Sequence, residues 1–431
     1  MRQSPRNLRL ACDHKGLTHF GGVYFFREFL GVLQFRNFLA RQLTYPRRNR
    51  RYSLSQMILA LVYPLVLGLD RLETVSFWHL PISDWSAELP RSTDVAPILT
   101  PRSGLVFAAD ARMNDRLLQN FIHLPDHRSR WIFDLDSSVV TVFGRQERAE
   151  VGYNPRYRGK RSYHPLLCVE ANSSYLWDTE LRPGNAGTWD GSVELMATCF
   201  LNVPRDIREL RVRADAGFGF HPVLEILETR GAQYAVVARL TQAFKRLLPG
   251  LHYESVNQEW EMAEFEYRPH GWPQARRFVV ARRFIPDEEP PSTLFILGRY
   301  VYRAWVTNLD LTPSGIWHYY DGRAAIEPRI CELREDYAFR KIPTASFAAN
   351  ALYLEIVRLA YNLVTAFQRT GLAASWQSLT LQKLRYKLFL MPGELTRPQN
   401  RPTLRLANSP MLQGWTENIL DRVHKLKPLE E

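Results

Sequence analysis

The stretch Trp131-Ile-Phe-Asp-Leu-Asp-Ser-Ser138 is a short apolar run that ends in two carboxylates and two hydroxyls. A nearly continuous apolar run is typical of a strand that is buried on both faces of a sheet. Asp134 and Asp136 then lie on the same face, because side chains alternate along a strand. Burying two carboxylates is costly unless cations compensate them. The alternative is an exposed edge strand or turn in which water solvates both aspartates.

Length and composition indicate a folded protein with a positively charged surface. The 431 residues are enough for two or three domains. A hydrophobic fraction of 45% and an aromatic fraction of 12% exclude a globally disordered chain. Lys plus Arg outnumber Asp plus Glu by 56 to 44, which gives a formal net charge of +12. This charge favours polyanionic partners, nucleic acid first and an anionic membrane second.

The cysteines and the apolar runs indicate a soluble cytoplasmic protein. The four cysteines are far apart and form no CxxC pair, so neither a zinc site nor a disulfide framework is indicated. The most apolar run, residues 57–69, is shorter than the roughly 20 residues that a bilayer span requires. The N-terminus lacks the apolar segment of a signal peptide. We therefore expect no membrane partner.

Residues 1–125 are predicted to form a mainly helical region that binds DNA. Apolar residues over 25–39 have the spacing of amphipathic helices, and Ser53 is a suitable N-cap for a helix over 57–67. Residues 93–112 show no clear periodicity. A basic cluster suits contact with phosphates, although a solvated loop explains it equally well: Arg47, Arg48, Arg50 and Arg51.

Residues 126–240 alternate between strand and helix patterns. We expect the first strand to run from Trp131 on to about Phe143. The expected strands that follow are 164–170, 175–181, 207–214 and 233–238, and the expected helices are 192–201 and 222–229. The first three strands have the short connections of an antiparallel meander, whereas strand, helix and strand in succession imply a right-handed crossover and parallel neighbours. Asp215 therefore follows the carboxyl end of a strand, where α/β sheets commonly place ligand sites.

The remaining chain divides into three parts. Residues 241–310 contain strand-like segments separated by Pro and Gly turns, which indicates a mostly β insertion. Residues 311–370 are predicted to be helical and to complete the domain that begins at residue 126. Residues 371–431 form a basic C-terminal region. The expected fold class is α/β with a mixed sheet.

Three acidic residues are candidates for a common site. If the strands before Asp136 and Asp215 are neighbours, a helix packed across them brings Glu327 close to both. A carboxylate cluster is a hard-oxygen site that suits Mg²⁺ or Mn²⁺. Two such ions activate water and stabilise the leaving oxygen in phosphodiester cleavage. A single acidic residue is more commonly structural, so the prediction depends on all three.

Three motifs resemble the catalytic motifs of the DDE transposases that bacterial insertion sequences encode: Asp136-Ser-Ser, Asp215-Ala-Gly-Phe and Tyr320-x₂-Arg323-x₃-Glu327-x₆-Arg334. The third is similar to the Tyr-Arg-Glu-Lys signature of one cut-and-paste group, with Arg where that signature ends in Lys. Arg holds phosphate bidentately where Lys offers a point charge, so this departure is chemically mild. Pro328 predicts that a helix begins or kinks next to the third carboxylate. The resemblance also includes residues 153–165, 182–185 and 360–363.

The resemblance implies an RNase H-like catalytic domain with a β insertion before the third carboxylate. It implies that the catalytic residues, which also bind two divalent ions, Mg²⁺ or Mn²⁺, are Asp136, Asp215 and Glu327. It further implies that phosphates near the cleaved strand are contacted by Tyr320, Arg323 and Arg334. A basic, aromatic loop adds four candidate phosphate contacts: Arg156, Arg158, Lys160 and Arg161.

The implied function is a transposase that binds terminal inverted repeats and cleaves and transfers DNA strands. Its implied partners are double-stranded repeat and target DNA and a second copy of the chain in a synaptic homodimer, in the bacterial cytoplasm at the nucleoid. One alternative is an inactive copy that binds DNA without cutting it, and another is a metal-dependent nuclease without strand transfer. Salt-dependent DNA binding is expected of all three and does not separate them.

Overall fold

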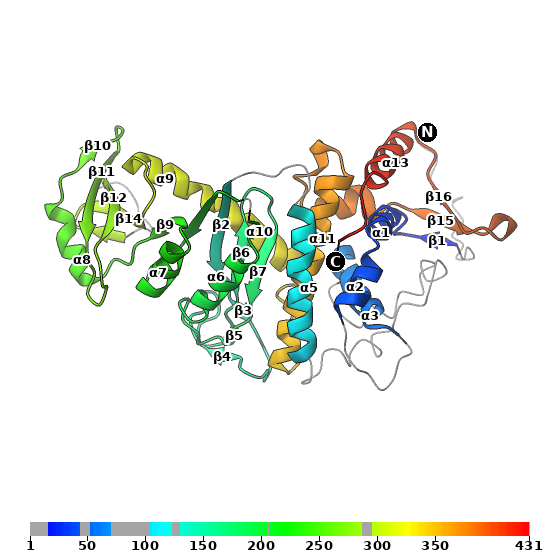
Figure 1. Cartoon of the computed structure of the whole chain (residues 1–431), viewed down its shortest axis with the longest axis horizontal. Coiled ribbons are helices and arrows are strands. Elements are labelled where there is room, and N and C mark those ends of the chain that lie inside the picture. The colour runs from blue at the N-terminus through cyan, green and yellow to red at the C-terminus, as the bar shows by residue number, and fades with distance from the viewer. Residues whose placement is uncertain are drawn as a thin grey trace, which may run out of the picture.

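The computed structural model describes residues 16–43, 52–69, 104–122, 130–205, 207–286 and 295–430. The molecule is elongated, with a β-rich end, a central sheet and a helical end that contains both the N-terminal and the C-terminal segments (Figure 1). The helices are α1 Val23–Val32, α2 Phe35–Gln42, α3 Leu54–Leu67, α5 Gly104–Ile122, α6 Ser192–Leu201, α7 His221–Thr229, α8 Gln242–Leu247, α9 Pro313–Asp321, α10 Ile326–Asp336, α11 Phe347–Gly371, α12 Leu381–Leu384 and α13 Pro410–Val423. The strands are β1 Leu17–Thr18, β2 Arg130–Ser137, β3 Val140–Thr141, β4 Glu150–Val151, β5 Arg161–Tyr163, β6 Leu166–Glu170, β7 Leu176–Glu180, β8 Glu209–Ala214, β9 Gln233–Val237, β10 Glu254–Ser255, β11 Trp260–Tyr267, β12 Arg276–Phe284, β13 Phe295–Leu297, β14 Tyr300–Thr307, β15 Gly393–Thr396 and β16 Thr403–Leu406.

A ten-stranded mixed sheet extends from the β-rich end to the centre of the molecule (Figure 1). Its strand order is β10-β11-β12-β14-β9-β8-β2-β6-β7, and β13 pairs with β14. Strands β2, β6 and β7 are antiparallel neighbours, which confirms the predicted meander. Strand β2 is parallel to β8, and β8 is parallel to β9, which confirms the crossover. The strands that precede the two candidate aspartates are therefore adjacent.

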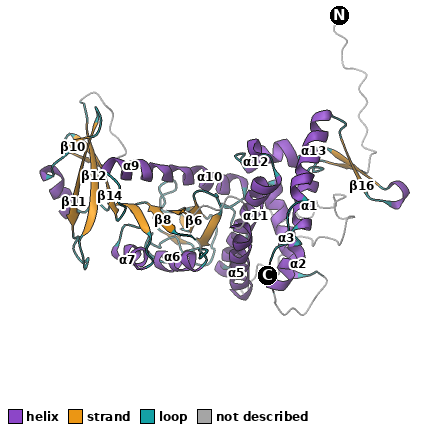
Figure 2. Ribbon diagram, turned by 45° about the horizontal axis from the view of Figure 1, so that its top comes forward, coloured by secondary structure: helices purple, strands orange, loops and turns teal. Residues whose placement is uncertain are grey.

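Helices cover both faces of this sheet. Helices α6 and α7 lie along one face, and α9 and α10 run along the opposite face (Figure 2). Phe133 and Leu135 on β2 are completely buried, which accounts for the apolar character of this strand. The helix predicted over 192–201 coincides with α6.

The structure differs from the expected strand pattern at two places. The first strand was expected to continue to Phe143, but β2 ends at Ser137 and Ser138 N–H donates to the carbonyl of Pro165 at 3.0 Å. The chain then enters a separate three-stranded sheet of order β3-β5-β4, because β3 pairs with β5 rather than with β6. At the other edge, β14 pairs antiparallel with β9, so the strands of residues 241–310 extend the central sheet.

The N-terminal segment is helical, as expected from its apolar spacing. The pattern over 25–39 forms two helices, α1 and α2, separated by Gln34 with a φ of 50°. Ser53 caps α3 in a capping box, in which its side chain accepts from the backbone N–H of Gln56 and the Gln56 side chain accepts in return. The basic cluster over 47–51 lies outside the described residues. Of the stretch 93–112, the described part begins α5.

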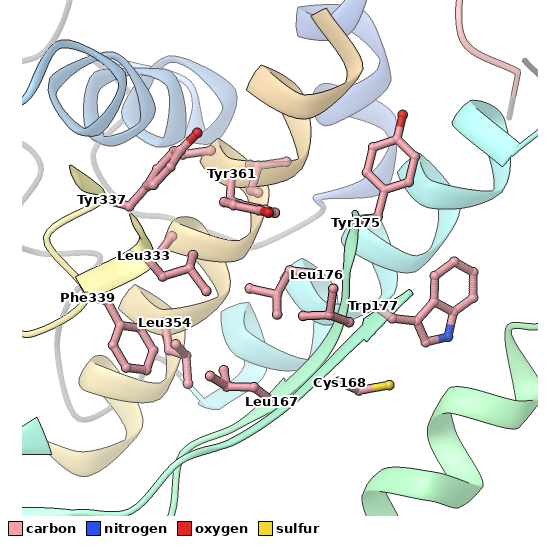
Figure 3. Close-up of a cluster of buried hydrophobic side chains, with 14 of the residues drawn as sticks. Leu167, Cys168, Tyr175, Leu176, Trp177, Leu333, Tyr337, Phe339, Leu354 and Tyr361 are labelled. Atoms are coloured by element: carbon pink, nitrogen blue, oxygen red, sulfur yellow. The ribbon is translucent and has the colours of Figure 1, made fainter. Parts of the chain in front are cut away.

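The helical end packs around α11, which is 25 residues long and mostly buried. Phe26 and Phe29 of α1 lie against Phe367 of α11, at ring-centroid distances of 5.6 and 5.3 Å. Strand β1 pairs with β15, so the two ends of the chain share this part of the core. Figure 3 shows the neighbouring cluster, where side chains of β6 and β7 approach α10 and α11. None of the helices in the described ranges is both long and apolar enough to cross a membrane.

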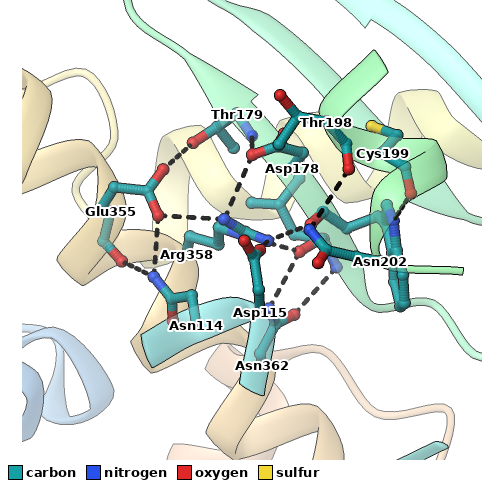
Figure 4. Close-up of polar contacts among 12 residues, drawn as sticks. Asn114, Asp115, Asp178, Thr179, Thr198, Cys199, Asn202, Glu355, Arg358 and Asn362 are labelled. Atoms are coloured by element: carbon teal, nitrogen blue, oxygen red, sulfur yellow. Dashed lines mark hydrogen bonds and ion pairs between the residues drawn. The ribbon is translucent and has the colours of Figure 1, made fainter. Parts of the chain in front are cut away.

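A buried polar network joins α11 to the sheet and to α5 (Figure 4). Arg358 on α11 is completely buried and donates to three carboxylates on α5, β7 and α11: Asp115, Asp178 and Glu355. Its guanidinium also donates to the carbonyl of Trp177. Burial raises the pKa of Asp178 to about 7, against the opposing charge of Arg358. The network therefore holds three carboxylates around one cation inside the protein.

Candidate active site

Asp136 and Asp215 lie at the same edge of the central sheet. Asp136 is the penultimate residue of β2, and Asp215 directly follows β8, the parallel neighbour of β2. The carboxyl ends of parallel neighbours meet at one edge of a sheet, where ligand sites commonly form. Each carboxylate accepts a backbone N–H at 2.8 Å, from Ser137 and Gly217 respectively. These bonds orient both side chains at the strand ends.

Glu327 lies on one of the helices that cross the sheet. Helix α9 passes into a short 3₁₀ turn at Gly322–Ala325 and then into α10, whose second residue is Glu327. Pro328 is thus in the first turn of α10, where a backbone N–H has no intrahelical partner and Pro is tolerated. The expectation that a helix begins next to Glu327 is confirmed.

The three carboxylates line one cavity of about 1480 Å³. The cavity is bounded by the end of β2, by β3 and the segments that connect the strands of the small sheet, and by residues of α10. Residues from α3 and α11 close it on the side of the helical end. The structure thus brings together side chains that are separated by 191 residues of sequence, from Asp136 to Glu327.

The electrostatics of the cavity are unfavourable to a charged Asp136. Burial, together with the negative charges of Asp215 and Glu327, raises the pKa of Asp136 to about 6. The Arg323 guanidinium opposes this shift, with its Nη2 at 3.2 Å from Asp136 Oδ1. The same nitrogen donates to the Leu135 carbonyl at 3.0 Å, so Arg323 is fixed against β2. A cluster of like charges with one cationic neighbour has the character of a cation-binding site.

Asp134 has a different environment, although it shares a face of β2 with Asp136. Its two carboxylate oxygens accept from Arg213 Nε and Nη2 at 2.6 and 2.8 Å. Arg213 also donates to the carbonyl of Tyr319 on α9, at 3.0 Å. Asp134 is therefore the partner of a buried arginine that joins two strands and a helix.

The residues of the third motif lie close to the carboxylates. Tyr320 packs against Trp305 at a ring-centroid distance of 5.9 Å, and burial raises its pKa to about 12. The charges of Asp215 and Asp136 also raise this pKa, and the charge of Arg323 opposes them. Arg334 lines the cavity, and its buried Nε has no hydrogen-bond partner among the described residues.

The four basic residues of the loop separate into two groups. Arg156 lines the cavity, where its guanidinium lies 5.7 Å from the centre of the Tyr157 ring. The other three are exposed and do not belong to the cavity lining: Arg158, Lys160 and Arg161. Of the four predicted phosphate-binding residues of this loop, only Arg156 thus lies at the cavity of the carboxylates.

Several cavity residues were not predicted from the sequence. His164 holds Ser137, with its Nε2 at 3.1 Å from Ser137 Oγ, while its Nδ1 lies 3.0 Å from the carbonyl of Ala186. Burial lowers the pKa of His164. Arg340 also lines the cavity. Its position directly before Lys341, after a predicted helix, was a weak basic signal in the sequence.

The carboxylates provide the chemistry of a divalent-cation site. Oxygen ligands from Asp and Glu suit Mg²⁺ and Mn²⁺. Burial is the main cause of the raised pKa of Asp136, and the charges of Asp215 and Glu327 add to it. Within the described ranges, no three Asp, Glu, His or Cys side chains lie close enough together to hold a metal ion. The three carboxylates thus supply ligand atoms of a suitable type at one cavity.

Fold and site define a mixed α/β protein with an acidic cavity at the carboxyl ends of two parallel strands. The sequence matches the family model for the transposase DDE domain group 1 over residues 94–428. The chain therefore belongs to this family of DDE transposases, as the three motifs predicted.

Among solved structures, seven chains match. One is the piggyBac transposase in a cryo-EM structure of its synaptic complex with hairpin DNA, with 12% sequence identity and a TM-score of 0.47. The similarity covers 88% of this chain and 82% of that chain. No curated protein matches the sequence.

Proposed function

We propose that this chain is the transposase of a bacterial insertion sequence, which binds terminal inverted repeats and catalyses metal-dependent DNA cleavage and strand transfer. The single observation that carries the proposal is the common cavity of Asp136, Asp215 and Glu327. The match to the DDE family supports phosphoryl transfer as the reaction class. The strand order β7-β6-β2-β8-β9, with its antiparallel and parallel halves, supports an RNase H-like catalytic domain.

In this proposal the acidic residues hold the ions and the cationic residues hold the DNA. Asp136, Asp215 and Glu327 would bind two Mg²⁺ or Mn²⁺ ions, which supply Lewis-acid stabilisation and lower the pKa of the attacking water or hydroxyl. Arg323 keeps Asp136 in position and favours its ionised form. Arg334 lines the cavity, and its guanidinium suits a phosphate oxygen.

The proposed partners extend beyond the cavity. The exposed basic residues at 158–161, the N-terminal helical region and the basic C-terminal region would contact the phosphates of double-stranded repeat DNA. Two DNA ends have to be held together for transposition, so we propose that the chain acts as a homodimer in the synaptic complex. We propose that it acts on nucleoid DNA in the bacterial cytoplasm.

The test is cleavage of DNA that carries the repeats flanking its own gene, with Mg²⁺ or Mn²⁺. Asp136→Asn, Asp215→Asn and Glu327→Gln should each abolish nicking while leaving repeat binding within a few-fold of the unmodified chain. Glu417→Gln is the matched control, because Glu417 is an exposed carboxylate on α13 outside the cavity. Retained cutting by all three cavity variants would refute the proposal.

The same assay separates the alternatives. A copy that only binds DNA would shift the repeat DNA in a gel and leave it uncut at every metal concentration. A nuclease would cut without joining the 3′ ends to target DNA. Joined products that disappear with Asp136→Asn and persist with Glu417→Gln would establish strand transfer.

A further inference from the structure

Three exposed aromatic side chains line the same cavity as the carboxylates. Phe143, Tyr153 and Tyr157, here called the aromatic rim, have exposed fractions of 80%, 72% and 43% and all line the cavity. They belong to the segments between β3 and β5, next to the end of β2. Exposing large rings is unfavourable in water, so three of them at one cavity suggest a surface that is covered by a ligand.

The aromatic rim is held in place by the small sheet and its turn. Asn154 is buried and donates from Nδ2 to Thr141 Oγ1 at 2.9 Å. Its Oδ1 accepts from the backbone N–H of Tyr157 at 3.0 Å. Phe143 and Tyr157 lie edge to face with their ring centroids 6.1 Å apart. The rings are therefore positioned before any ligand binds.

Beside the aromatic rim lies a group of arginines, Arg156, Arg334 and Arg340, here called the arginine wall. All three line the cavity, and the buried Nε atoms of Arg334 and Arg340 have no hydrogen-bond partner within the described chain. Arg340 also pairs with Glu335. Burial and the charges of Arg334 and Arg156 lower the pKa of Arg340. Three guanidiniums at one cavity, two of which have an Nε without a hydrogen-bond partner in the described chain, have the properties of an anion site.

We propose that the aromatic rim and the arginine wall bind an unpaired segment of the DNA strand next to the cleaved phosphate. The bases of this segment stack on Phe143 and Tyr157, and its phosphates lie against the arginine wall. This inference rests on the proposed function, because it names the form of DNA that occupies the same cavity.

Unpaired DNA fits this combination better than a duplex does. In a duplex the faces of the bases are stacked on one another, and only phosphates and groove edges are presented to a protein. An unpaired base offers a π face to an exposed ring, and such stacking is tolerant of sequence. Rings beside guanidiniums match the bases and phosphates that a single strand presents together. An acidic peptide would satisfy the arginine wall but would leave the rings exposed.

The test is a binding measurement on the full chain without divalent ions, so that no cleavage occurs. The probe is a 12-base single strand with 2-aminopurine at its centre, compared with the same sequence as a duplex. Stacking of 2-aminopurine on a ring quenches its fluorescence. The variants are Phe143→Ala/Tyr157→Ala and Arg340→Gln. Matched controls are Phe284→Ala, an exposed ring on β12, and Arg246→Gln, an exposed arginine of α8 outside the cavity lining.

The expected result is quenching of the single-stranded probe and weaker or no quenching of the duplex. The ring double variant should lose the quenching and bind the single strand roughly tenfold or more weakly. Arg340→Gln should weaken binding, and both controls should behave like the unmodified chain. Equal quenching by the ring variant would overturn the proposal. Competition by inorganic polyphosphate without any quenching would also overturn it, because the arginine wall would then bind phosphate alone.

Cys331 provides a second readout at the same place. It is exposed and lines the cavity next to the arginine wall, whereas Cys168 and Cys199 are buried. In a Cys12→Ser background, the single-stranded probe should protect the Cys331 thiol from alkylation, and the ring double variant should lose this protection. Failure of this proposal is distinguishable from failure of the proposed function. Cleavage that needs the carboxylates, without protection or quenching, would refute only the unpaired-strand site, and quenching without cleavage would refute only the catalytic function.

Discussion

Arg213 on β8 donates two parallel hydrogen bonds to the carboxylate of Asp134 on β2, at 2.6 and 2.8 Å, while Asp136 two residues later points into the cavity. This pair decides which of the two aspartates is available for chemistry. Both partners of the pair are buried, and Arg213 also donates a hydrogen bond to the carbonyl of Tyr319 on α9. Asp134 therefore stabilises the junction between the sheet and α9, and Asp136 is the one that lines the cavity.

We expect Asp134→Ala to destabilise the protein by about 3–5 kcal/mol, because it leaves the Arg213 charge buried without its partner. The measurement is the free energy of unfolding in urea. Replacing both residues, as in Asp134→Leu/Arg213→Met, should cost less than either single change, since no unpaired charge remains. Glu264→Gln is the control, because its pair with Arg277 is partly exposed and should contribute less than about 1 kcal/mol. A loss from Asp134→Ala as small as the control would contradict the structural role.

Asp136→Asn should raise the stability of the metal-free protein at neutral pH. The pKa of Asp136 is about 6 in the folded state and 3.8 for a model carboxyl, so the folded state holds the extra proton between these values. Stability from this group is present at low pH and is lost as the pH rises from 3.8 to 6. The gain from Asn at pH 8 has an upper bound of about 3 kcal/mol.

The measurement is the difference in Tm between Asp136→Asn and the unmodified chain in EDTA, at pH 5 and at pH 8. The difference should be larger at pH 8. Glu417→Gln, on the surface of α13, should show little difference at either pH. A variant that is less stable than the unmodified chain at pH 8 would contradict the cost of burying the Asp136 charge in this cavity.

Arg323→Gln should lower the rate of DNA nicking and move the acid limb of its pH profile to higher pH. Arg323 lies 3.2 Å from Asp136 and lowers the pKa of that carboxyl, so its removal leaves more of Asp136 protonated at a given pH. The measurement is the initial nicking rate from pH 5.5 to 9, where Arg277→Gln should follow the unmodified chain. An unchanged pH profile with a lowered rate would mean that Arg323 acts only on the DNA.

Arg358→Met should be among the most destabilising single changes in the helical end. The change leaves three carboxylates, Asp115, Asp178 and Glu355, without the cation that they surround. We expect a loss of about 3–5 kcal/mol, measured by urea unfolding. Arg369→Met on the same helix is a control, because Arg369 lies near the end of α11 and is only partly buried. Equal losses from both changes would argue against a central role of the network.

Much of the local structure followed from the sequence because it depends on nearby residues. The capping residue Ser53 and the apolar period of α6 are contained within a few turns of chain. The alternation of strand and helix over 164–238 was sufficient to predict which strands are parallel. The three candidate carboxylates were predicted from motifs that resemble those of DDE transposases, and all three line one cavity.

Other features depend on contacts between residues that are far apart in the chain. The small sheet of β3, β4 and β5 diverts the chain after Ser137, and this places Phe143 and Tyr157 at the cavity. No periodicity in the sequence indicates that diversion, since β3 and β4 have only two residues each. The pairing of β14 with β9 is likewise a contact between segments of different predicted domains.

The sequence by itself determined the order of strands and helices and the three acidic positions, because local periodicity and motif spacing are properties of the chain. Only the tertiary structure decided that Asp134 pairs with Arg213 and that Asp136 lines the cavity. It also decided that Arg156 and Arg340 share the cavity with the carboxylates while Arg158 does not. The physical reason is that the cost of burying a charge depends on which distant residue lies next to it. The residues of β8, α9 and α10 reach the aspartates of β2 only when the sheet has formed.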